Sequence, residues 1–386
     1  MKLLIKVLKY LLSGLFILII ALYVFNFDYL LTAINVTYLR GHKTAYLDDY
    51  KHFDNRTIAA PEQPQFWPIH EDYNKANPTG QLQELHDSYG TVAFLIIKND
   101  SLWHEQYFEG YDEHSKSNSF SMAKSFVSAM LGSAILEGSI KGLEQPVGDF
   151  FPEFSQGIAS KLTVGDLSSM SSGLDWDESY YSPFSVTTRA YFDKELRPVI
   201  RDLKVVESPG TGFKYLSGNT QLLGMILEKA TGKPLAEYLS EHFWKPMGAE
   251  NDGLWQLDSE TSGMEKAYCC VAASARDFAR FGKLYKDLGA WKGKQLIPES
   301  FAQRSVTPRF EKDPEYGYGL WLLQHNGKDF FMLRGHLGQY VIVQPEDNVI
   351  IVRLGHRAAP KKGNDPFRED IYGYIDQSYK MMEYAP

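Results

Sequence analysis

The sequence "FSMAKSFVSAM", residues 120–130, places Ser121 and Lys124 three positions apart at the start of an apolar helical pattern. Residues three apart are neighbours on a helix surface, so the Ser121 hydroxyl and the Lys124 amine can come together. The small and apolar residues after Lys124 supply few polar partners for its charge. Because a buried lysine without a function is costly, this stretch predicts a core helix that begins with a chemical site.

The pair of side chains suits nucleophilic catalysis. A serine hydroxyl becomes an effective nucleophile when a neighbouring base takes its proton. Lysine can be that base once burial or nearby cations lower its pKa below the usual value of about 10.4. At a helix start, the Ser121 backbone N–H is also free to bind a developing oxyanion. The alternative is a purely structural role, in which Ser121 only caps the amino end of the helix.

Composition limits what the chain can be. Its 386 residues are 44% apolar and 14% aromatic, which is enough for one large or two smaller globular domains. The net charge of -8 provides no basic stripe for a phosphate backbone, so we expect no nucleic acid partner. The two cysteines, Cys269 and Cys270, are adjacent, which predicts buried small side chains without a disulfide. Neither they nor the ten histidines form a metal-binding pattern, and we expect no metal or cofactor.

The amino terminus has the pattern of a membrane anchor. Lys2, Lys6 and Lys9 precede an uncharged run over residues 10–27, and eighteen helical residues span roughly 27 Å, close to a bilayer core. Large residues at 23–27 disfavour a cleavage site, so we expect a retained signal anchor rather than a cleaved signal peptide. The positive-inside rule places the amino terminus in the cytoplasm and the domain outside it, in the periplasm of a Gram-negative cell.

The rest of the chain divides into a lead-in at residues 28–88, packed on a domain at 89–386, with the anchor at 1–27. The runs "TVAFLIIKND" and "SLWHEQYFEG", residues 91–110, predict a hairpin that turns at Asn99 and Asp100. Helical patterns dominate from 121 to about 300, strands return over 316–355, and residues 365–384 predict a final helix. This order predicts an α+β fold in which both ends of the domain form one antiparallel sheet, with a helical lobe and a cleft between them.

Three motifs in order carry a family resemblance. They are SMAK at 121–124, YLS at 215–217 and HLG at 336–338. With connecting strings such as "LTVGDLSSMSSGLDWDE" and "GHLGQYVIVQPEDNVIIV", they make the chain resemble the serine beta-lactamase and penicillin-binding-protein superfamily. The similarity is to its class C-like branch of esterases, D-aminopeptidases and 6-aminohexanoate-dimer hydrolases. It implies a beta-lactamase/transpeptidase-like αβα sandwich with a helical lobe, and serine hydrolase activity.

The resemblance also implies roles for individual residues. Ser121 would be the acylated nucleophile, Lys124 its base, and Tyr215 the phenol that moves protons to and from the leaving group. The oxyanion would be held by the N–H groups of Ser121 and Gln339, with Gly338 allowing close approach of the substrate. Without the other motifs, Tyr215 would be only one of 24 tyrosines.

The chain departs from the family pattern around the substrate. Lactamases and transpeptidases usually carry Lys and Thr or Ser in the third motif, where this chain has His336 and Leu337. Leucine has no hydroxyl and an ordinary histidine is mostly neutral at pH 7, so we expect weak carboxylate recognition there. Ser217 replaces the usual Asn at the second motif, with Asn219 as a partial substitute. These changes favour an ester or a simple amide over a beta-lactam.

Two functions follow from these residues. The first is a membrane-anchored extracytoplasmic serine hydrolase that cleaves a small-molecule ester or amide. The second is a non-catalytic, penicillin-binding-like module that recognises cell-envelope peptide or a protein partner. An intact set of Ser121, Lys124 and Tyr215 favours the enzyme. Asp175 and Asp177 in "GLDWDES" are expected in a solvated loop, outside the catalytic set.

Overall fold

A six-stranded antiparallel sheet, with strand order β3-β2-β12-β11-β10-β9, forms the centre of the molecule. It belongs to a computed structural model that describes residues 1–383. Strand β2 pairs with β12, so the beginning and the end of the domain close one sheet, as predicted. The strands are β2 (Thr91–Lys98), β3 (Ser101–Tyr107), β9 (Trp321–His325), β10 (Lys328–Gly335), β11 (Gln339–Gln344) and β12 (Val349–Gly355).

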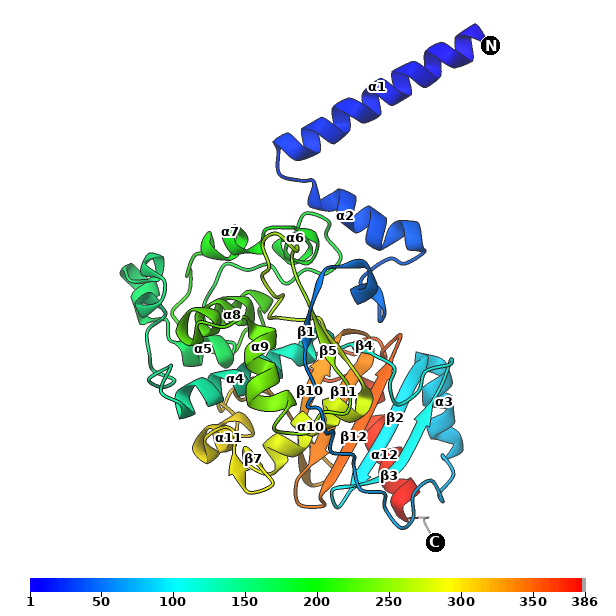
Figure 1. Cartoon of the computed structure of the whole chain (residues 1–386), viewed down its shortest axis with the longest axis vertical. Coiled ribbons are helices and arrows are strands. Elements are labelled where there is room, and N and C mark those ends of the chain that lie inside the picture. The colour runs from blue at the N-terminus through cyan, green and yellow to red at the C-terminus, as the bar shows by residue number, and fades with distance from the viewer. Residues whose placement is uncertain (384–386) are drawn as a thin grey trace.

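Strand β2 shows why its sequence is a continuous apolar run. Ala93, Leu95 and Ile97 belong to the larger core cluster, whereas Phe94 and Ile96 belong to a second cluster on the opposite face. A strand with both faces buried has no polar alternation. Helix α10 contacts one face of the sheet, and α3 and α12 pack together on the other (Figure 1). The three helices are α3 (Gly80–Tyr89), α10 (Ala275–Lys286) and α12 (Glu369–Glu383), and with the sheet they form the predicted αβα sandwich.

Local turn chemistry matches the sequence at the β2–β3 hairpin. Asn99 has φ +51° and Asp100 has φ +59°, the left-handed pair that a tight two-residue hairpin needs. The final helix begins four residues later than predicted, because Asp365 accepts a hydrogen bond from the Phe367 N–H and forms a turn first.

The helical lobe lies between the two groups of strands in sequence. Its helices are α4 (Ala123–Leu136), α5 (Val164–Ser168), α6 (Val186–Phe192), α7 (Leu196–Arg201), α8 (Ser217–Thr231), α9 (Leu235–Leu239) and α11 (Glu299–Ser305). Helix α4 is buried from Ala123 to Ala134 and packs against α8. A 3₁₀ turn, η3 (Phe120–Met122), precedes it and contains Ser121. The serine therefore sits where the chain enters a fixed, fully packed helix.

The segment before the sandwich is attached through a second sheet. Strand β1 (Asn55–Ile58) joins β5 (Gly253–Gln256), β6 (Val271–Ala273) and β4 (Ser117–Asn118) in the order β1-β5-β6-β4. Helix α2 (Tyr29–Val36) packs on α6 at one end of the helical lobe (Figure 1). A short ribbon completes the strands, formed by β7 (Ala290–Trp291) and β8 (Lys294–Gln295).

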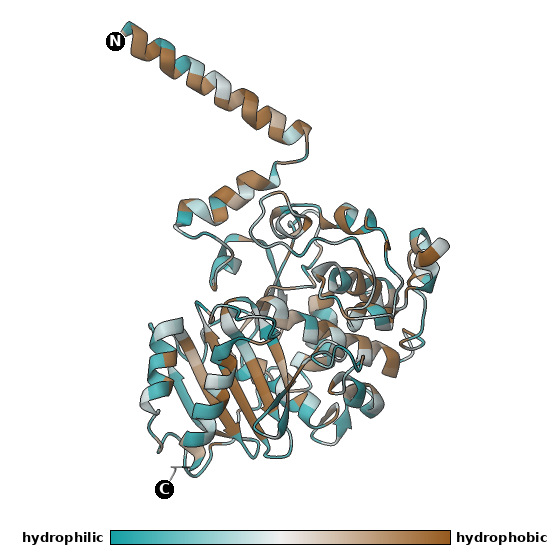
Figure 2. Cartoon of the chain, turned by 180° about the vertical axis from the view of Figure 1, so that it is seen from behind, coloured by the Kyte–Doolittle hydropathy of each residue, from teal (hydrophilic) through white to brown (hydrophobic). Residues whose placement is uncertain are grey.

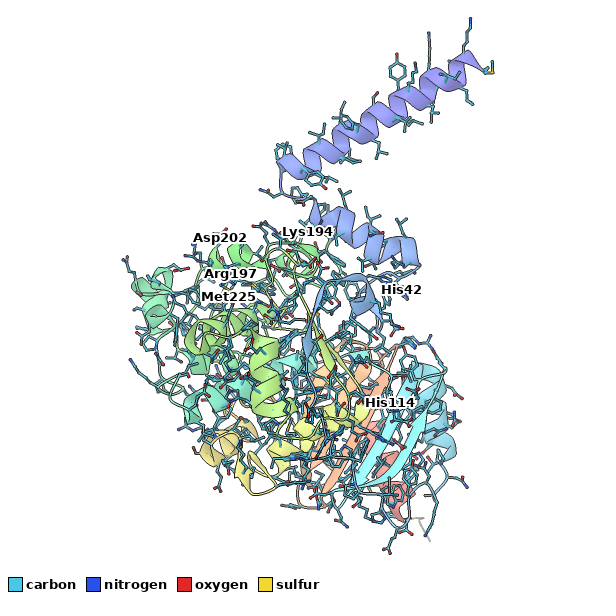
Figure 3. The ribbon with its side chains drawn as sticks, in the orientation of Figure 1. His42, His114, Lys194, Arg197, Asp202 and Met225 are labelled. Carbon is cyan, nitrogen blue, oxygen red and sulfur yellow. A yellow bond between two sulfur atoms is a disulfide. The ribbon has the colours of Figure 1, made fainter. Side chains whose placement is uncertain are left out.

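Helix α1 (Lys2–Val24) extends away from the domain. It is long and apolar enough to cross a membrane, and none of its residues is buried by the described chain. Most of the helix is coloured as hydrophobic in Figure 2, and its side chains project away from the domain along its length (Figure 3). An apolar helix with no protein partner is what a membrane span or a signal sequence presents.

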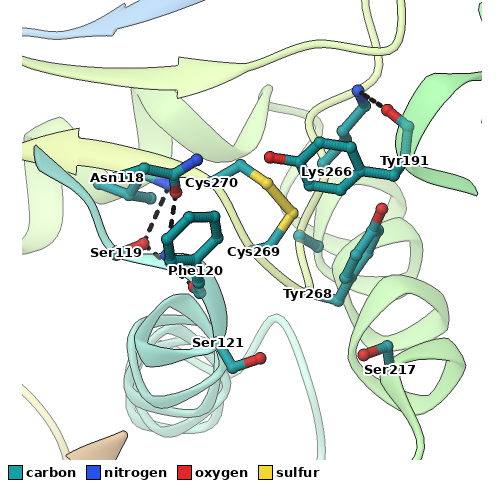
Figure 4. The surroundings of a disulfide bond; sticks show 12 residues. Asn118, Ser119, Phe120, Ser121, Tyr191, Ser217, Lys266, Tyr268, Cys269 and Cys270 are labelled. Atoms are coloured by element: carbon teal, nitrogen blue, oxygen red, sulfur yellow. Dashed lines mark hydrogen bonds between the residues drawn. A yellow bond between two sulfur atoms is a disulfide. The ribbon is translucent and has the colours of Figure 1, made fainter. Parts of the chain in front are cut away.

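The prediction that the two cysteines form no disulfide is wrong. Cys269 and Cys270 are joined by a disulfide, with their Cα atoms 3.7 Å apart, and both are buried (Figure 4). The prediction used the Cα separations typical of cysteines from distant parts of a chain. Here the turn before β6, with Cys270 at φ +74°, brings the two neighbouring sulfur atoms together instead.

Candidate active site

The turn η3 and the start of α4 bring Ser121 and Lys124 together. Lys124 Nζ donates hydrogen bonds to Ser121 Oγ at 3.0 Å and to the Tyr268 carbonyl at 2.8 Å. The lysine is only 3% exposed, and this burial lowers its pKa to about 8, against the opposing charge of Glu178. The buried amine is thus much easier to deprotonate than an ordinary lysine, and it lies beside a hydroxyl.

Tyr268, which holds Lys124 through its carbonyl, directly precedes the disulfide. Figure 4 shows the Tyr268 ring beside the Cys269–Cys270 bridge, with Ser121 and Ser217 in the same view. The Tyr268 ring also lies 5.6 Å from Lys124 Nζ. The disulfide therefore constrains the backbone that supplies the lysine with its second hydrogen-bond acceptor. The sequence motifs gave no signal for the contact between Tyr268 and Lys124, because only the fold brings these two residues together.

Tyr215 lies just before α8 and faces the same lysine. Its ring centroid is 5.0 Å from Lys124 Nζ. Burial raises the pKa of the Tyr215 phenol well above its usual value, although the Ser121 hydroxyl acts in the opposite direction. Burial thus moves the two pKa values apart, lowering that of the lysine and raising that of the phenol, so the lysine is the easier group to deprotonate. Such a split suits a base and an acid acting in one site.

Ser217 faces a carboxylate that sequence reasoning missed. Its N–H and its hydroxyl donate to Glu178 at 2.6 Å and 2.7 Å, and the Tyr180 hydroxyl donates to the same carboxylate at 2.5 Å. Asp175 and Asp177, the acids noted in the sequence, are exposed as expected. Glu178 directly follows Asp177 and lies two residues before Tyr180, so the signal was an acid close to a tyrosine in the same loop.

Asn219 does not take the place of the missing second-motif asparagine. Its side chain is fully buried, accepts a hydrogen bond from the Ser172 hydroxyl and donates to the Met170 sulfur. About half a turn of α8 separates it from Ser217 and places it in the core. The expected partial substitution is wrong because helical geometry points residues two apart in different directions.

His336 occupies η8 (His336–Gly338), the turn between β10 and β11. Its ring stacks on Tyr180 at 5.8 Å and meets Phe120 edge-on at 5.6 Å. Burial, with Arg368 nearby, lowers the pKa of His336 to about 4. Nε2 is shielded from solvent and has no hydrogen-bond partner within residues 1–383. The site therefore contains a neutral imidazole whose Nε2 is buried and unpaired within the described residues.

The glycine of the third motif serves the protein's own packing. Gly338 has φ +85°, and a Cβ there would collide with Arg353 Nη1. Buried Arg353 donates to the carbonyls of Leu337 and Gly338 and so holds the turn in place. The structural reason for Gly338 is thus close approach of Arg353, whereas the sequence suggested close approach of a substrate. Gln339 accepts from the Gly355 N–H and donates to the Gly355 carbonyl, so its side chain is engaged too.

Two cavities meet at Ser121. The first, about 350 Å³, extends to α2 and is lined mainly by apolar side chains. The second, about 410 Å³, contains Arg334, Lys361 and Arg368. Tyr180 and His336 line both. Among residues 1–383, no group of three or more His, Cys, Asp or Glu side chains could hold a metal ion.

The comparisons with known proteins agree with this geometry. The chain is 29% identical over 288 residues to the 6-aminohexanoate-dimer hydrolase of Paenarthrobacter ureafaciens. This alignment covers 68% of this chain and 72% of that protein. It is 27% identical over 195 residues to a D-aminopeptidase of Gluconobacter oxydans, covering 44% of this chain and 37% of the relative.

A solved structure shares the fold. A Bacillus anthracis protein provisionally assigned as a 6-aminohexanoate-dimer hydrolase aligns with a TM-score of 0.70 and 24% identity, over 86% of this chain and 92% of its own. The family model described as Beta-lactamase matches residues 81–371, a span that includes all three motifs. Because this match covers most of the sequence, the chain belongs to the beta-lactamase family of serine hydrolases.

Proposed function

We propose that this protein is a membrane-anchored, extracytoplasmic hydrolase that cleaves an ester or amide through an acyl-enzyme on Ser121. The observation that carries the proposal is the 3.0 Å hydrogen bond between Ser121 Oγ and a buried lysine whose pKa is lowered to about 8. A serine beside a base of this kind can be deprotonated as it attacks. The similarity of this chain to hydrolases supports the same role for Ser121.

In acylation, Ser121 Oγ bonds to the substrate carbonyl carbon and its proton passes to the Lys124 amine. The N–H groups of Ser121 and Gln339 stabilise the oxyanion that forms. The bond to the leaving group then breaks, and the leaving group takes a proton from the Tyr215 phenol. Lys124 returns a proton to Tyr215. In deacylation a water molecule attacks the acyl carbon, and Ser121 leaves with a proton as the carboxylic acid forms.

The substrate side of the site supports an ester or simple amide. His336 and Leu337 provide neither the fixed charge nor the hydroxyl that hold the carboxylate of a beta-lactam. His336 is a neutral imidazole here, so it supplies no positive charge to a substrate carboxylate. Ser217 lines the first cavity, beside Ser121 and His336.

We further propose that α1 anchors the protein, with its amino terminus in the cytoplasm. The segments would then be an anchor at 1–27, a lead-in at 28–88 and a hydrolase domain at 89–386. Three lysines before the apolar run support this orientation. The pairing of β1 with β5 supports a lead-in that packs on the domain.

The proposal is tested on the full-length chain in lipid nanodiscs with a fluorophosphonate probe and intact mass spectrometry. We expect a single adduct on the wild type and none on Ser121→Ala or Lys124→Met. Ser125→Ala is the matched control, because Ser125 lies one turn along α4 and donates to the Gly319 carbonyl.

The contrary outcomes are clear. No adduct on folded wild type, or an adduct that persists in Ser121→Ala, would remove the proposed nucleophile and favour the non-catalytic module. Turnover of nitrocefin equal to that of short-chain esters would contradict the substrate class.

A further inference from the structure

One wall of the first cavity is formed by residues outside the three sequence motifs. Leu30, Ala33 and Ile34 of α2 line it on one side, and Tyr181 and Phe184 line it on the other. Its volume of about 350 Å³ lies within the range of small-molecule sites, and it leads to Ser121. A mainly apolar cavity beside a nucleophile is suited to the apolar part of a substrate.

Helix α2 is held in place over this cavity by specific contacts. The Tyr29 hydroxyl donates to the Pro183 carbonyl at 3.0 Å, and the Phe27 and Phe184 rings meet edge-on at 5.9 Å. Tyr29 and Phe192 also belong to a small apolar core that joins α2 to α6. The wall is therefore a packed part of the fold.

The mouth of the cavity exposes large apolar side chains. Tyr181 is 82% exposed and Phe184 is 69% exposed, and Ile34 on α2 is also exposed. Exposed apolar groups gathered at one place mark a surface for an apolar ligand or a membrane. Helix α1 ends at Val24, only five residues before α2 begins at Tyr29. If α1 spans a membrane as proposed above, this mouth lies next to the bilayer surface.

The second cavity has the opposite character. Arg334, Lys361 and Arg368 line it, with Glu315 as the acidic side chain among its lining residues, which leaves an excess of positive charge. Arg334 is held in place by a hydrogen bond to the Pro366 carbonyl at 2.7 Å. These cations lie outside the three motifs, and they can bind an anion that His336 and Leu337 cannot.

From this juxtaposition we propose that the substrate is an anionic amphiphile. Its apolar chain lies in the cavity under α2, its anionic group lies beside Arg334, Lys361 and Arg368, and the scissile ester or amide lies between them at Ser121. This inference rests on the proposed function. Each methylene buried from water improves binding about fourfold, so chain length is a sensitive measure of the first cavity.

The test measures kcat/KM for full-length protein in lipid nanodiscs with defined esters. The substrates are 4-acetoxybenzoate, 4-octanoyloxybenzoate and the neutral methyl ester of the latter, together with mono-octyl succinate and its methyl ester for the reverse orientation. We expect an anionic octyl or octanoyl substrate to exceed 4-acetoxybenzoate by at least about 100-fold and its neutral counterpart by at least about tenfold. Either orientation of the preferred ester supports the proposal.

Matched variants separate the two cavities. Ile34→Asp places a charge at the apolar mouth and should lower the octanoyl-to-acetyl ratio at least tenfold. Leu39→Asp makes the same change at an exposed position outside the cavity and should leave the ratio within twofold. Lys361→Gln should reduce the preference for the anionic ester. Its neighbour Lys362, which pairs with Glu369, is the control and should change nothing when replaced by Gln.

Short-ester turnover and fluorophosphonate labelling report on the proposed function separately. If wild type labels and cleaves 4-acetoxybenzoate but shows no preference for the chain or the anion, the amphiphile proposal is overturned while the hydrolase stands. If Ile34→Asp and Leu39→Asp change the ratio equally, the cavity under α2 does not bind the chain. Absence of labelling on folded wild type would instead remove the proposed function itself.

Discussion

At the scale of single residues, the site depends on the opposite effects that burial has on the pKa values of Lys124 and Tyr215. Burial disfavours charge, so it lowers the pKa of the Lys124 ammonium and raises that of the Tyr215 phenol. Neither shift requires a metal or a strong neighbouring cation. The reactive pair is therefore a consequence of where α4 begins relative to the core.

Replacing the lysine should separate stability from activity. Because the folded state binds the Lys124 proton less tightly than the unfolded chain, this residue lowers the free energy of unfolding as pH falls from about 10.5 to about 8. At pH 7, Lys124→Met should be about 1–3 kcal/mol more stable than wild type, while ester turnover falls about 10²–10⁴-fold. Urea unfolding and kcat/KM measure the two effects. A less stable methionine variant would mean that the hydrogen bonds of Lys124 outweigh its burial cost.

The pH dependence of the wild type follows from the same shift. In the proposed mechanism the neutral Lys124 amine is the base, so kcat/KM should rise with pH and level off above about 8.

Glu178 should set the position of that rise. Its negative charge raises the pKa of Lys124, against the larger effect of burial. In Glu178→Gln the ammonium loses this support, so the ascending limb should move to lower pH by up to about one unit. Asp177→Asn, a neighbouring exposed position, is the control. A profile that moves to higher pH, or that moves equally in both variants, contradicts this role.

At the scale of elements, the turn between β10 and β11 shows how a motif position can serve the fold. Leu337 and Gly338 both have positive φ, and Arg353 on β12 donates to both of their carbonyls. A buried guanidinium from a neighbouring strand thus fixes the loop that presents His336 and the Gln339 N–H.

Gly338→Ala should therefore lower the free energy of unfolding by more than backbone strain alone would. The new Cβ would push against Arg353, so we expect a loss of about 2–3 kcal/mol in the free energy of unfolding. Gly327→Ala is the matched control, since Gly327 has φ +74° with no atom within 4 Å of the added Cβ, and should cost about 1 kcal/mol. If thermal or urea unfolding shows the same loss of stability in both variants, Arg353 can move away from the added Cβ without a free-energy penalty.

The turn before β6 contains the disulfide, which can be tested chemically. Protein made under oxidising conditions and denatured without reductant should not react with iodoacetamide, because Cys269 and Cys270 are bonded to each other. Reduction before alkylation should label both cysteines, as read by intact mass. Alkylation of both without reductant would mean that the bond is absent.

At the scale of the whole molecule, α2 connects the domain to the apolar helix α1. Figure 1 shows α1 extending from the domain on the side where α2 packs over α6. This arrangement places the mouth of the apolar cavity on the same side as the helix. The position of the active site relative to α1 is thus built into the packing of the lead-in.

Membrane insertion gives the test at this scale. The full chain should resist carbonate extraction, and protease added outside spheroplasts should digest the domain. Leu15→Arg combined with Leu18→Arg places two charges in the apolar run, each costing about 2.5–3.5 kcal/mol at the span centre, and should release the protein. Leu39→Arg lies beyond the run and should stay in the membrane fraction. A wild type released by carbonate would contradict the anchor.

From the amino-acid sequence, hydrophobic periodicity predicted one antiparallel sheet with a helical lobe, the Asn99–Asp100 turn predicted a hairpin, and the SxxK spacing predicted the Ser121–Lys124 pair. These three patterns are local. The family and the αβα sandwich were implied by the resemblance that the three ordered motifs carry. Only the tertiary structure brought Glu178 to Ser217 and Arg353 to Gly338, and placed Arg334 and Ile34 in two cavities that meet at Ser121. These residues are far apart in sequence, and their roles come from burial and distance. The disulfide was missed for a different reason: Cys269 and Cys270 are adjacent, and their adjacency gives no signal of the backbone turn, with Cys270 at φ +74°, that joins them.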